Sequence, residues 1–276
     1  NGMDIKVTLP ESYVVASNGV RSGIMDNADG TRTHHWIESY PIATYLFNIS
    51  AASYNETVEY FHYSDTDSMP IIYFTTGTVP SGFHYVETAL PIFSNLFGLY
   101  PFVDEKFAIN KVSSNGWAME HQNNVTTATT SGMTQVHELG HQWFGDKVTT
   151  RDWQHGWLNE GFATYSEALF FEHFYDRETY DSYMRDMMSA YFSGIGGEGD
   201  FPIYDPEWMW GVHSYQKGGI VLHMLRHLIG DSLFYATLDQ YGQTYAFSNA
   251  TTADFQAQAE TVTDENLDWF FQQWIY

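Results

Sequence analysis

Cysteine is absent from the 276-residue sequence, which excludes disulfide bonds, thiolate metal ligands and a thiol nucleophile. Positive charge is scarce: 11 Lys and Arg residues stand against 34 Asp and Glu, for a formal net charge of −23. Such a surface repels phosphate backbones and anionic membranes, so we expect neither nucleic acid nor a membrane as a partner. Solubility is the simplest explanation of the acidic balance.

Long apolar runs are also missing. No such run approaches the roughly 18 residues of a membrane-spanning helix, and no basic, apolar leader precedes Asn1. We therefore expect a signal peptide to be either absent or already removed. A secreted or periplasmic location is the expectation, with the cytoplasm as the alternative, and the oligomeric state is left open. A hydrophobic content of 43% indicates a folded domain with a real core.

The periodicity of the sequence changes near residue 77. Residues 1–76 are β-branched and aromatic with stretches of period two, including an Asn18-Gly19 turn, and predict an antiparallel sheet. Residues 77–276 are mostly helical, so we predict an α+β fold with domains at 1–76 and 77–276. Pro91 is expected to kink a helix at 81–98 or to mark its first turn. The Gly-rich stretch at 193–200 predicts an interruption of the helices, as a surface loop or a mobile lid.

The stretch VHELGHQWFG at 136–145 carries two histidines, His137 and His141, with Glu138 directly after the first. On a helix, residues four apart lie about 40° apart around the axis, so both imidazoles face one ion. Glu138 lies about 100° round from His137, where a base can reach a water held by the metal. The pattern predicts a catalytic zinc site, and two histidines that merely share a helical face are the alternative.

A third ligand is predicted in WLNEGFATYSEAL, at 157–169. Glu160 follows the second histidine by eighteen intervening residues, and antiparallel packing of two helices would bring it opposite the pair. Two imidazoles and one carboxylate leave the fourth zinc position open for water. Glu167 is either a hydrogen-bond partner of a ligand histidine or a solvated glutamate. His223 and His227 have the same spacing without an adjacent glutamate, and we interpret them as packing or surface histidines.

Four motifs together resemble the gluzincin aminopeptidases, the family of aminopeptidase N and leukotriene hydrolase. They are GWAME at 116–120, HELGHQWFG, WLNEGFA and SYQKGGIVLHML at 214–225, in the family's order. The resemblance implies a thermolysin-like zinc peptidase domain at 77–276, preceded by the end of a β-sheet saddle domain at 1–76. It also implies that ENLDWFFQQW lies at the end of the catalytic domain.

The resemblance implies a metal-dependent mechanism for peptide hydrolysis. One zinc ion per chain is held by His137, His141 and Glu160. Glu138 is the general base that activates water and passes the proton to the leaving amine. Tyr215, in the Tyr-x-Lys-Gly segment, donates its hydroxyl to the developing oxyanion.

The same resemblance implies a binding site for the N-terminus of a peptide substrate. Glu120 binds the free α-ammonium group, because a buried cation needs an opposite charge. The backbone of Gly116, Ala118 and Met119 pairs with the substrate main chain as an edge strand. His121 stands where the family has asparagine, and either orients this loop or adds a charge beside the ammonium site.

Family members extend further on both sides, so the chain is expected to be an excised catalytic core or a fragment of a longer secreted protein. Two alternatives stay open beside the aminopeptidase. The first is a zinc endopeptidase in which Glu120 does not select free N-termini. The second is a non-catalytic module that binds peptide or sugar through its nine tryptophans and twenty tyrosines.

Overall fold

The computed structural model describes residues 2–276, and these fall into two compact units. Unit 1 consists of the residues up to Pro91 together with Leu99–Gln142, and unit 2 consists of Ile92–Gly98 and Trp143–Tyr276. Each unit is a set of residues that lie close together in space, and neither unit begins or ends at residues 76 and 77. The domain boundary at residues 76 and 77 therefore stays a prediction.

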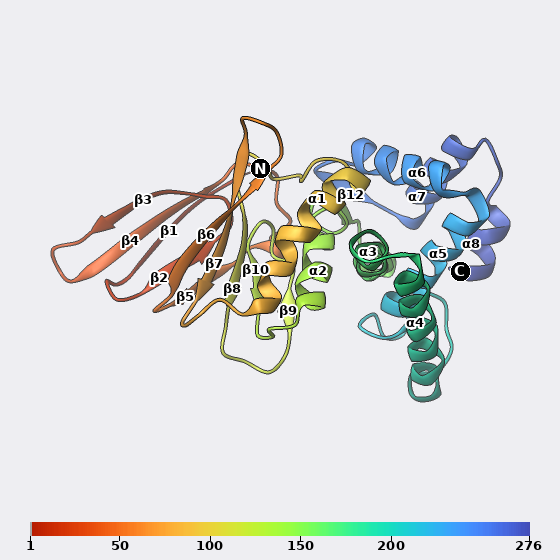
Figure 1. Cartoon of the computed structure of the whole chain (residues 1–276), viewed down its shortest axis with the longest axis horizontal. Helices are drawn as coiled ribbons and strands as arrows, with labels where there is room; N and C mark the ends of the chain where they lie inside the picture. Colours follow the sequence, from red (N-terminus) through yellow and green to blue (C-terminus); the bar gives the residue numbers. More distant parts are fainter. Residues whose placement is uncertain (1) are drawn as a thin grey trace. The chain divides into compact units, whose positions relative to one another are not determined.

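Unit 1 is built mainly of strands (Figure 1). In chain order they are β1 (Met3–Pro10), β2 (Val14–Ser17), β3 (Val20–Asp26), β4 (Thr31–Glu38), β5 (Ile49–Ala52), β6 (Asn55–His62), β7 (Ser68–Thr75), β8 (Phe107–Lys111), β9 (Ala118–Met119) and β10 (Val125–Thr127). The expected strands in the first 76 residues are thus confirmed. Short 3-10 turns lie at η1 (Thr44–Leu46) and η2 (Ser81–His84), and the unit ends in helix α2 (Gly132–His141).

The strands of unit 1 form three sheets rather than one. The first is antiparallel with the order β1-β4-β3, and the second is the antiparallel pair β2-β5. The third has the order β6-β7-β8-β10-β9, in which β7, β8 and β10 run parallel and the two edge strands are antiparallel. The Asn18-Gly19 turn therefore joins strands of two different sheets, and Gly19 adopts a left-handed φ of +75°.

A cluster of buried apolar side chains holds these sheets together. Trp36 from the first sheet packs edge-on against Phe74 from the third, with ring centroids 6.3 Å apart. Val15 from the second sheet belongs to the same cluster. Burying such large side chains stabilises the folded state by about 1.5–3 kcal/mol each. Strands β7 and β8 of the third sheet are thereby packed against the other two sheets.

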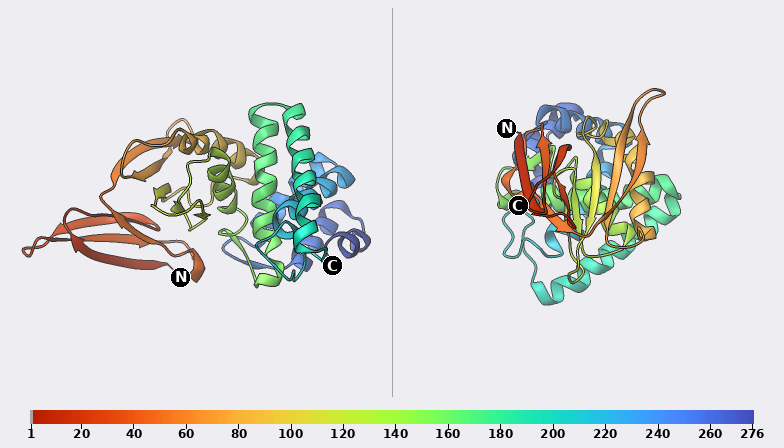
Figure 2. Two further views of the ribbon diagram at one scale, coloured as in Figure 1. Left: turned by 90° about the horizontal axis from the view of Figure 1, so that it is seen from below. Right: turned by 90° about the vertical axis from the view of Figure 1, so that its left-hand side faces the viewer.

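Unit 2 is almost entirely helical (Figure 1). Its elements are β11 (Val148–Thr150), η3 (Trp153–His155), α3 (Trp157–Phe174), α4 (Arg177–Glu198), the π-helix η4 (His213–Lys217), α5 (Gly218–Ile229), α6 (Asp231–Thr244), β12 (Ser248–Ala250), α7 (Thr252–Thr263) and α8 (Asp268–Trp274). Helices α3 and α4 lie side by side and are joined by a short turn (Figure 2). The α+β fold is confirmed.

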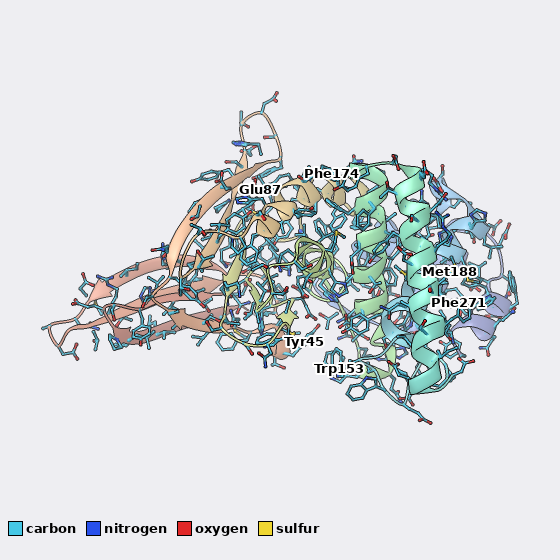
Figure 3. The ribbon with its side chains drawn as sticks, turned by 60° about the horizontal axis from the view of Figure 1, so that its bottom comes forward. Tyr45, Glu87, Trp153, Phe174, Met188 and Phe271 are labelled. Atoms are coloured by element: carbon cyan, nitrogen blue, oxygen red, sulfur yellow. The ribbon has the colours of Figure 1, made fainter. Side chains whose placement is uncertain are left out.

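The aromatic core of unit 2 surrounds the first turns of α3. Phe162 contacts Phe144, Trp157 and Phe255, with ring centroids 4.7, 5.7 and 5.1 Å away. Figure 3 labels Trp153, close to the start of α3, and Phe174 at its other end. The start of α3 is the more deeply buried end, because residues 157–166 are all buried whereas His173 and Phe174 are exposed.

Helix α1 (Tyr85–Phe97) begins after η2 and contains Pro91 in its interior. This excludes the first-turn alternative, and the kink at Pro91 stays a prediction. One local expectation was wrong. The Gly-rich stretch at 193–200 does not interrupt the helices, because α4 continues to Glu198. Each glycine costs a helix only about 1 kcal/mol, and α4 ends where Gly199 adopts a φ of +91°. Within residues 2–276, no helix is long and apolar enough to span a membrane.

Candidate metal centre

Helix α2 presents the His-Glu-x-x-His motif. Ser131, the N-cap residue directly before the helix, accepts a hydrogen bond through its side chain from the Thr134 backbone N–H at 3.3 Å. This cap satisfies one of the backbone donors that a helix start leaves open. His141 and Glu138 are buried and His137 is partly exposed, so the motif lies on a face of α2 that is largely shielded from water.

The two histidines aim their nitrogens at a common point. Their Nε2 atoms lie 3.1 Å apart, and the rings meet at an interplanar angle of 82°. In a tetrahedral zinc site with bonds of about 2.0–2.1 Å, two ligand nitrogens lie about 3.3–3.4 Å apart. The pair therefore has the geometry that two zinc ligands need, and its donor set of neutral imidazoles suits zinc.

Two carboxylates of unit 1 lie beside this pair. One ligand atom each of Glu120, Glu138 and His141 falls within 4.8 Å of the others, and all three residues are buried. Placing two carboxylates this close inside a protein favours a bound cation, because their mutual repulsion is strong at low dielectric. The predicted base and the predicted ammonium ligand are thus brought together.

Glu120 directly follows β9, the edge strand of the five-stranded sheet. Ala118 and Met119 pair with β10 on one side only, and Gly116 is exposed just before them. The other side of β9 carries the backbone groups that an extended peptide uses when it adds to a sheet edge. The predicted extended conformation of the GWAME stretch is confirmed for Ala118 and Met119 only, because Gly116 lies in a bend with a left-handed φ of +49°. The role of this stretch toward substrate stays a prediction.

His121 adds no charge beside Glu120. Burial lowers the pKa of its imidazole to about 4, so the side chain is neutral at pH 7. Its Nδ1 lies 3.0 Å from the Thr126 hydroxyl, in the strand that pairs with β9. Of the two expected roles, the structure therefore supports orientation of the loop and contradicts an added charge.

Glu160 lies in unit 2, in the first turn of α3, and only 5% of its surface is exposed. The neighbouring Asn159 accepts a hydrogen bond from the Thr150 backbone N–H at 3.3 Å, which ties the start of α3 to β11. Further along α3, Glu167 accepts a hydrogen bond from the Tyr183 hydroxyl at 2.7 Å. Glu167 is thus engaged within its own unit, and its contact with a ligand histidine stays a prediction.

Tyr215 lies in the π-helix η4, directly before α5. The wider turn is closed by a hydrogen bond from the Lys217 N–H to the Val212 carbonyl at 2.9 Å, five residues back. Single π turns inside helices occur frequently at functional sites. Sequence patterns indicated the tyrosine from its Tyr-x-Lys-Gly context but gave no sign of the π-helix.

Within unit 2, a contact between two glycines sets the position of the start of α3, which carries Glu160, relative to η4, which carries Tyr215. Gly161 follows Glu160, and a Cβ added to it would lie 2.9 Å from the Gly218 Cα. A Cβ on Gly218 would likewise lie 2.8 Å from the Gly161 Cα. Backbone therefore meets backbone at this crossing, and only glycine fits there. Both glycines stand inside recognised motifs, but their mutual contact cannot be seen in the sequence.

The second histidine pair lies on α5 and is surrounded differently. Its ring centroids are 6.1 Å apart, and His227 is exposed. His223 Nδ1 lies 2.6 Å from the Tyr180 hydroxyl, and burial lowers the pKa of this imidazole. Among residues 2–276, this pair belongs to no group of three potential metal ligands. These features agree with the interpretation as packing and surface histidines.

Comparison with known proteins finds a match to a peptidase family over the part of the chain that contains these residues. The model of the "Peptidase family M1 domain" matches residues 105–274, which is more than half of the chain. "Aminopeptidase M1-C" of Oryza sativa subsp. japonica is 33% identical over 149 residues, covering 51% of this chain and 17% of that protein. "Aminopeptidase 2" of Candida albicans is 28% identical over 233 residues, covering 74% and 25%. The chain thus spans a quarter or less of the length of these curated relatives.

Solved structures have the same fold. The M1 zinc metallopeptidase from Deinococcus radiodurans superposes with a TM-score of 0.87 at 24% identity, covering 99% of this chain and 63% of that chain. A mutant of that enzyme bound to a Tyr-Ser-Ala substrate gives a TM-score of 0.86, again at 24% identity, with coverage of 99% and 63%. Aminopeptidase A of Legionella pneumophila, in complex with aspartic acid, gives 0.84 at 18% identity and covers 99% and 34%.

Proposed function

The chain belongs to the M1 peptidase family, and on that premise we propose that it is a zinc aminopeptidase, which removes N-terminal residues from peptides. The observation that carries the proposal is the arrangement on and beside α2. Two imidazole nitrogens lie 3.1 Å apart, and the buried Glu120 and Glu138 carboxylates lie beside His141. A metal site, a base and an anionic group for a substrate amine are the three elements that such a reaction needs.

His137, His141 and Glu160 are the proposed ligands of one zinc ion per chain. The fit rests on the imidazole geometry within unit 1, and for Glu160 on its place in the first turn of α3 and on the spacing of the motif. When bound in such a site, zinc supplies Lewis acidity that polarises a carbonyl and lowers the pKa of water toward about 7.

Glu138 is the proposed general base. Its carboxylate accepts a proton from the attacking water and then delivers it to the leaving amine. Burial with only 6% exposure keeps bulk water from competing for that proton. Tyr215 is the proposed donor to the oxygen that gains negative charge, a contribution that typically changes the rate by about 10²–10³-fold.

Glu120 is the proposed ligand of the substrate's α-ammonium group. A free N-terminus carries the positive charge that this pair of neighbouring carboxylates favours, whereas an acetylated terminus does not. The backbone of Ala118 and Met119 would align the substrate along the edge of β9 that faces away from β10, with Gly116 in the bend that precedes the strand. The Deinococcus structure with a bound Tyr-Ser-Ala substrate supports peptides as the substrate class.

The decisive experiment compares fluorogenic aminoacyl substrates that have a free amine with their N-acetylated forms, on a sample of known zinc content. We expect turnover of the free-amine set only, at one zinc per chain. Glu138→Gln should retain the zinc and lower kcat by about 10²–10⁴-fold, because the amide cannot accept the proton.

Other outcomes separate the alternatives. Equal cleavage of both sets would indicate an endopeptidase in which Glu120 does not select free termini. Zinc binding without turnover of either set would contradict the proposed activity for this chain and favour a binding role.

A further inference from the structure

Gln142 has a buried side-chain amide that lies between helix α2, which carries the two histidines, and the segment that carries Glu120. It directly follows His141 and caps the C-terminus of α2, with helical φ and ψ of −60° and −27°. Its backbone N–H donates to the Leu139 carbonyl at 3.1 Å, and its side chain is fully buried. The position of this side chain is therefore set by the helix that carries the histidines.

The Gln142 amide makes hydrogen bonds with the segment that follows β9. Its Nε2 donates to the Glu120 carbonyl at 3.0 Å, and its Oε1 accepts from the Asn123 backbone N–H at 2.8 Å. The Tyr100 hydroxyl donates to the same Oε1 at 3.3 Å. One side chain thus satisfies both a backbone acceptor and a backbone donor of the turn at residues 120–123.

The far side of that turn is anchored in the β-rich part of unit 1. Asn123 adopts a left-handed φ of +49°, which asparagine tolerates better than most residues. Its side-chain oxygen accepts from Lys106 Nζ at 2.9 Å, and its amide donates to Glu38 and Glu105, each at 2.8 Å. Burial lowers the pKa of Lys106 and raises that of Glu38.

This arrangement holds the Glu120 main chain from two directions. The network around Asn123 fixes the turn to the sheets, and Gln142 fixes it to α2. The covalent link from Glu120 to His137 runs through sixteen intervening residues, so it defines the distance between them poorly. Misplacement of a binding group by about 1 Å can cost a factor of about 10² in rate.

We propose that Gln142 is a positioning residue, which sets the place of the Glu120 carboxylate relative to His141 and Glu138 through the Glu120 carbonyl. This inference rests on the proposed aminopeptidase function, in which Glu120 binds the α-ammonium group. Under this proposal, the affinity for a free N-terminus depends on Gln142, although Gln142 is not itself a proposed ligand of the metal or of the substrate.

The test replaces Gln142 by methionine, which has a similar length and no hydrogen-bonding amide. The matched control is Gln135→Met on the same helix, two turns earlier. Gln135 is also fully buried, and its amide donates to the Thr127 hydroxyl at 3.2 Å without reaching Glu120. Both variants lose a buried amide from α2, so general damage to the helix affects them alike.

We expect Gln142→Met to raise KM for free-amine substrates about tenfold, with kcat changed less than about threefold and zinc content unchanged. Gln135→Met should leave KM within about twofold of the wild type. An unchanged KM in Gln142→Met, or an equal rise in both variants, would overturn the proposal. If Gln142→Met fails to fold, Gln142→Leu is measured in the same way.

A second measurement keeps this inference separate from the proposed function. Should the wild-type protein not prefer free amines, amide hydrogen exchange is followed across residues 118–124 in all three proteins. Faster exchange of this segment in Gln142→Met alone would support positioning by Gln142. Equal exchange in all three would overturn it.

Discussion

Two helices of this protein each carry histidines four residues apart. His137 and His141 on α2 bring their Nε2 atoms to 3.1 Å, next to two buried carboxylates. On α5 the rings of His223 and His227 are 6.1 Å apart, and one of them is engaged by the Tyr180 hydroxyl. Identical spacing thus leads to two different environments.

The difference comes from the burial of the helix face and from its acidic neighbours. His141 is 1% exposed and is followed by the buried Gln142, whereas His227 is exposed to solvent. Glu138 supplies a carboxylate on α2, while residue 224 at the corresponding position of α5 is methionine. A helical pair of histidines becomes a candidate metal site only when the surrounding structure adds carboxylates and excludes water.

The largest effect is expected from His141→Ala. Removal of one of two facing imidazoles should reduce zinc from one per chain to an undetectable level and lower turnover by about 10³-fold or more. Metal analysis of the purified variant and kinetic assay at saturating substrate check both parts. Stoichiometric zinc in this variant would break the comparison, because α2 would then hold its metal by other groups.

Glu160→Ala should weaken zinc binding by more than about hundredfold, since it leaves two ligands in place of three. Competition with a chromophoric chelator measures the affinity. Glu167→Ala is the comparison on the same helix: its carboxylate accepts from Tyr183 and is not a proposed ligand, so we expect a smaller loss of affinity, of about tenfold. Unchanged affinity in Glu160→Ala would show that the third ligand is a different residue.

Gly218→Ala should lower kcat by about 10–100-fold with zinc content preserved. The added methyl would lie 2.8 Å from the Gly161 Cα, so η4 and Tyr215 must shift away from the start of α3. Gly219→Ala is the control, because its methyl would meet the flexible Met187 side chain at 3.0 Å. Steady-state kinetics with thermal melts distinguish the two, and equal kcat values would contradict a positioning role for the glycine contact.

The smallest effect is expected from the α5 pair. His223→Ala and His227→Ala should leave zinc content and kcat within about twofold of wild type. Loss of the hydrogen bond between His223 and Tyr180 should lower the free energy of unfolding by about 1 kcal/mol, whereas the exposed His227 should change it little. Denaturant titration and metal analysis check these values, and any loss of zinc would remove the contrast between the helices.

Sequence patterns predicted the elements whose signals are local. The strands of the first 76 residues contain stretches of alternating polarity, and the His-Glu-x-x-His motif lies on a helix, α2, as its spacing predicted. The Gly-rich stretch at 193–200 misled the prediction because glycine weakens a helix only mildly. Gly194 packs against Val212, and Gly196 and Gly197 have open space around them, so nothing opposes helix there.

The features that sequence could not supply depend on partners distant in the chain. Gln142 reaches the Glu120 carbonyl across 22 residues, and Gly161 meets Gly218 across a helix crossing. Neither glutamine nor glycine carries a signal that identifies such a partner. The roles of Glu120, Glu160 and Tyr215 stay predictions, because they concern a metal and a substrate.

The π-helix that carries Tyr215 has a consequence for how this protein tolerates change. A π turn holds one residue more than an α turn, so η4 is equivalent to a single-residue insertion at the start of α5. The buried face of α5, with Val221, Leu222 and Leu225, fixes the rotation of that helix. Deleting one residue from η4 would turn the tyrosine by about 100° around the axis while the apolar face stayed in register. A change of one residue in chain length can therefore re-aim the Tyr215 hydroxyl without any change to the buried face of α5.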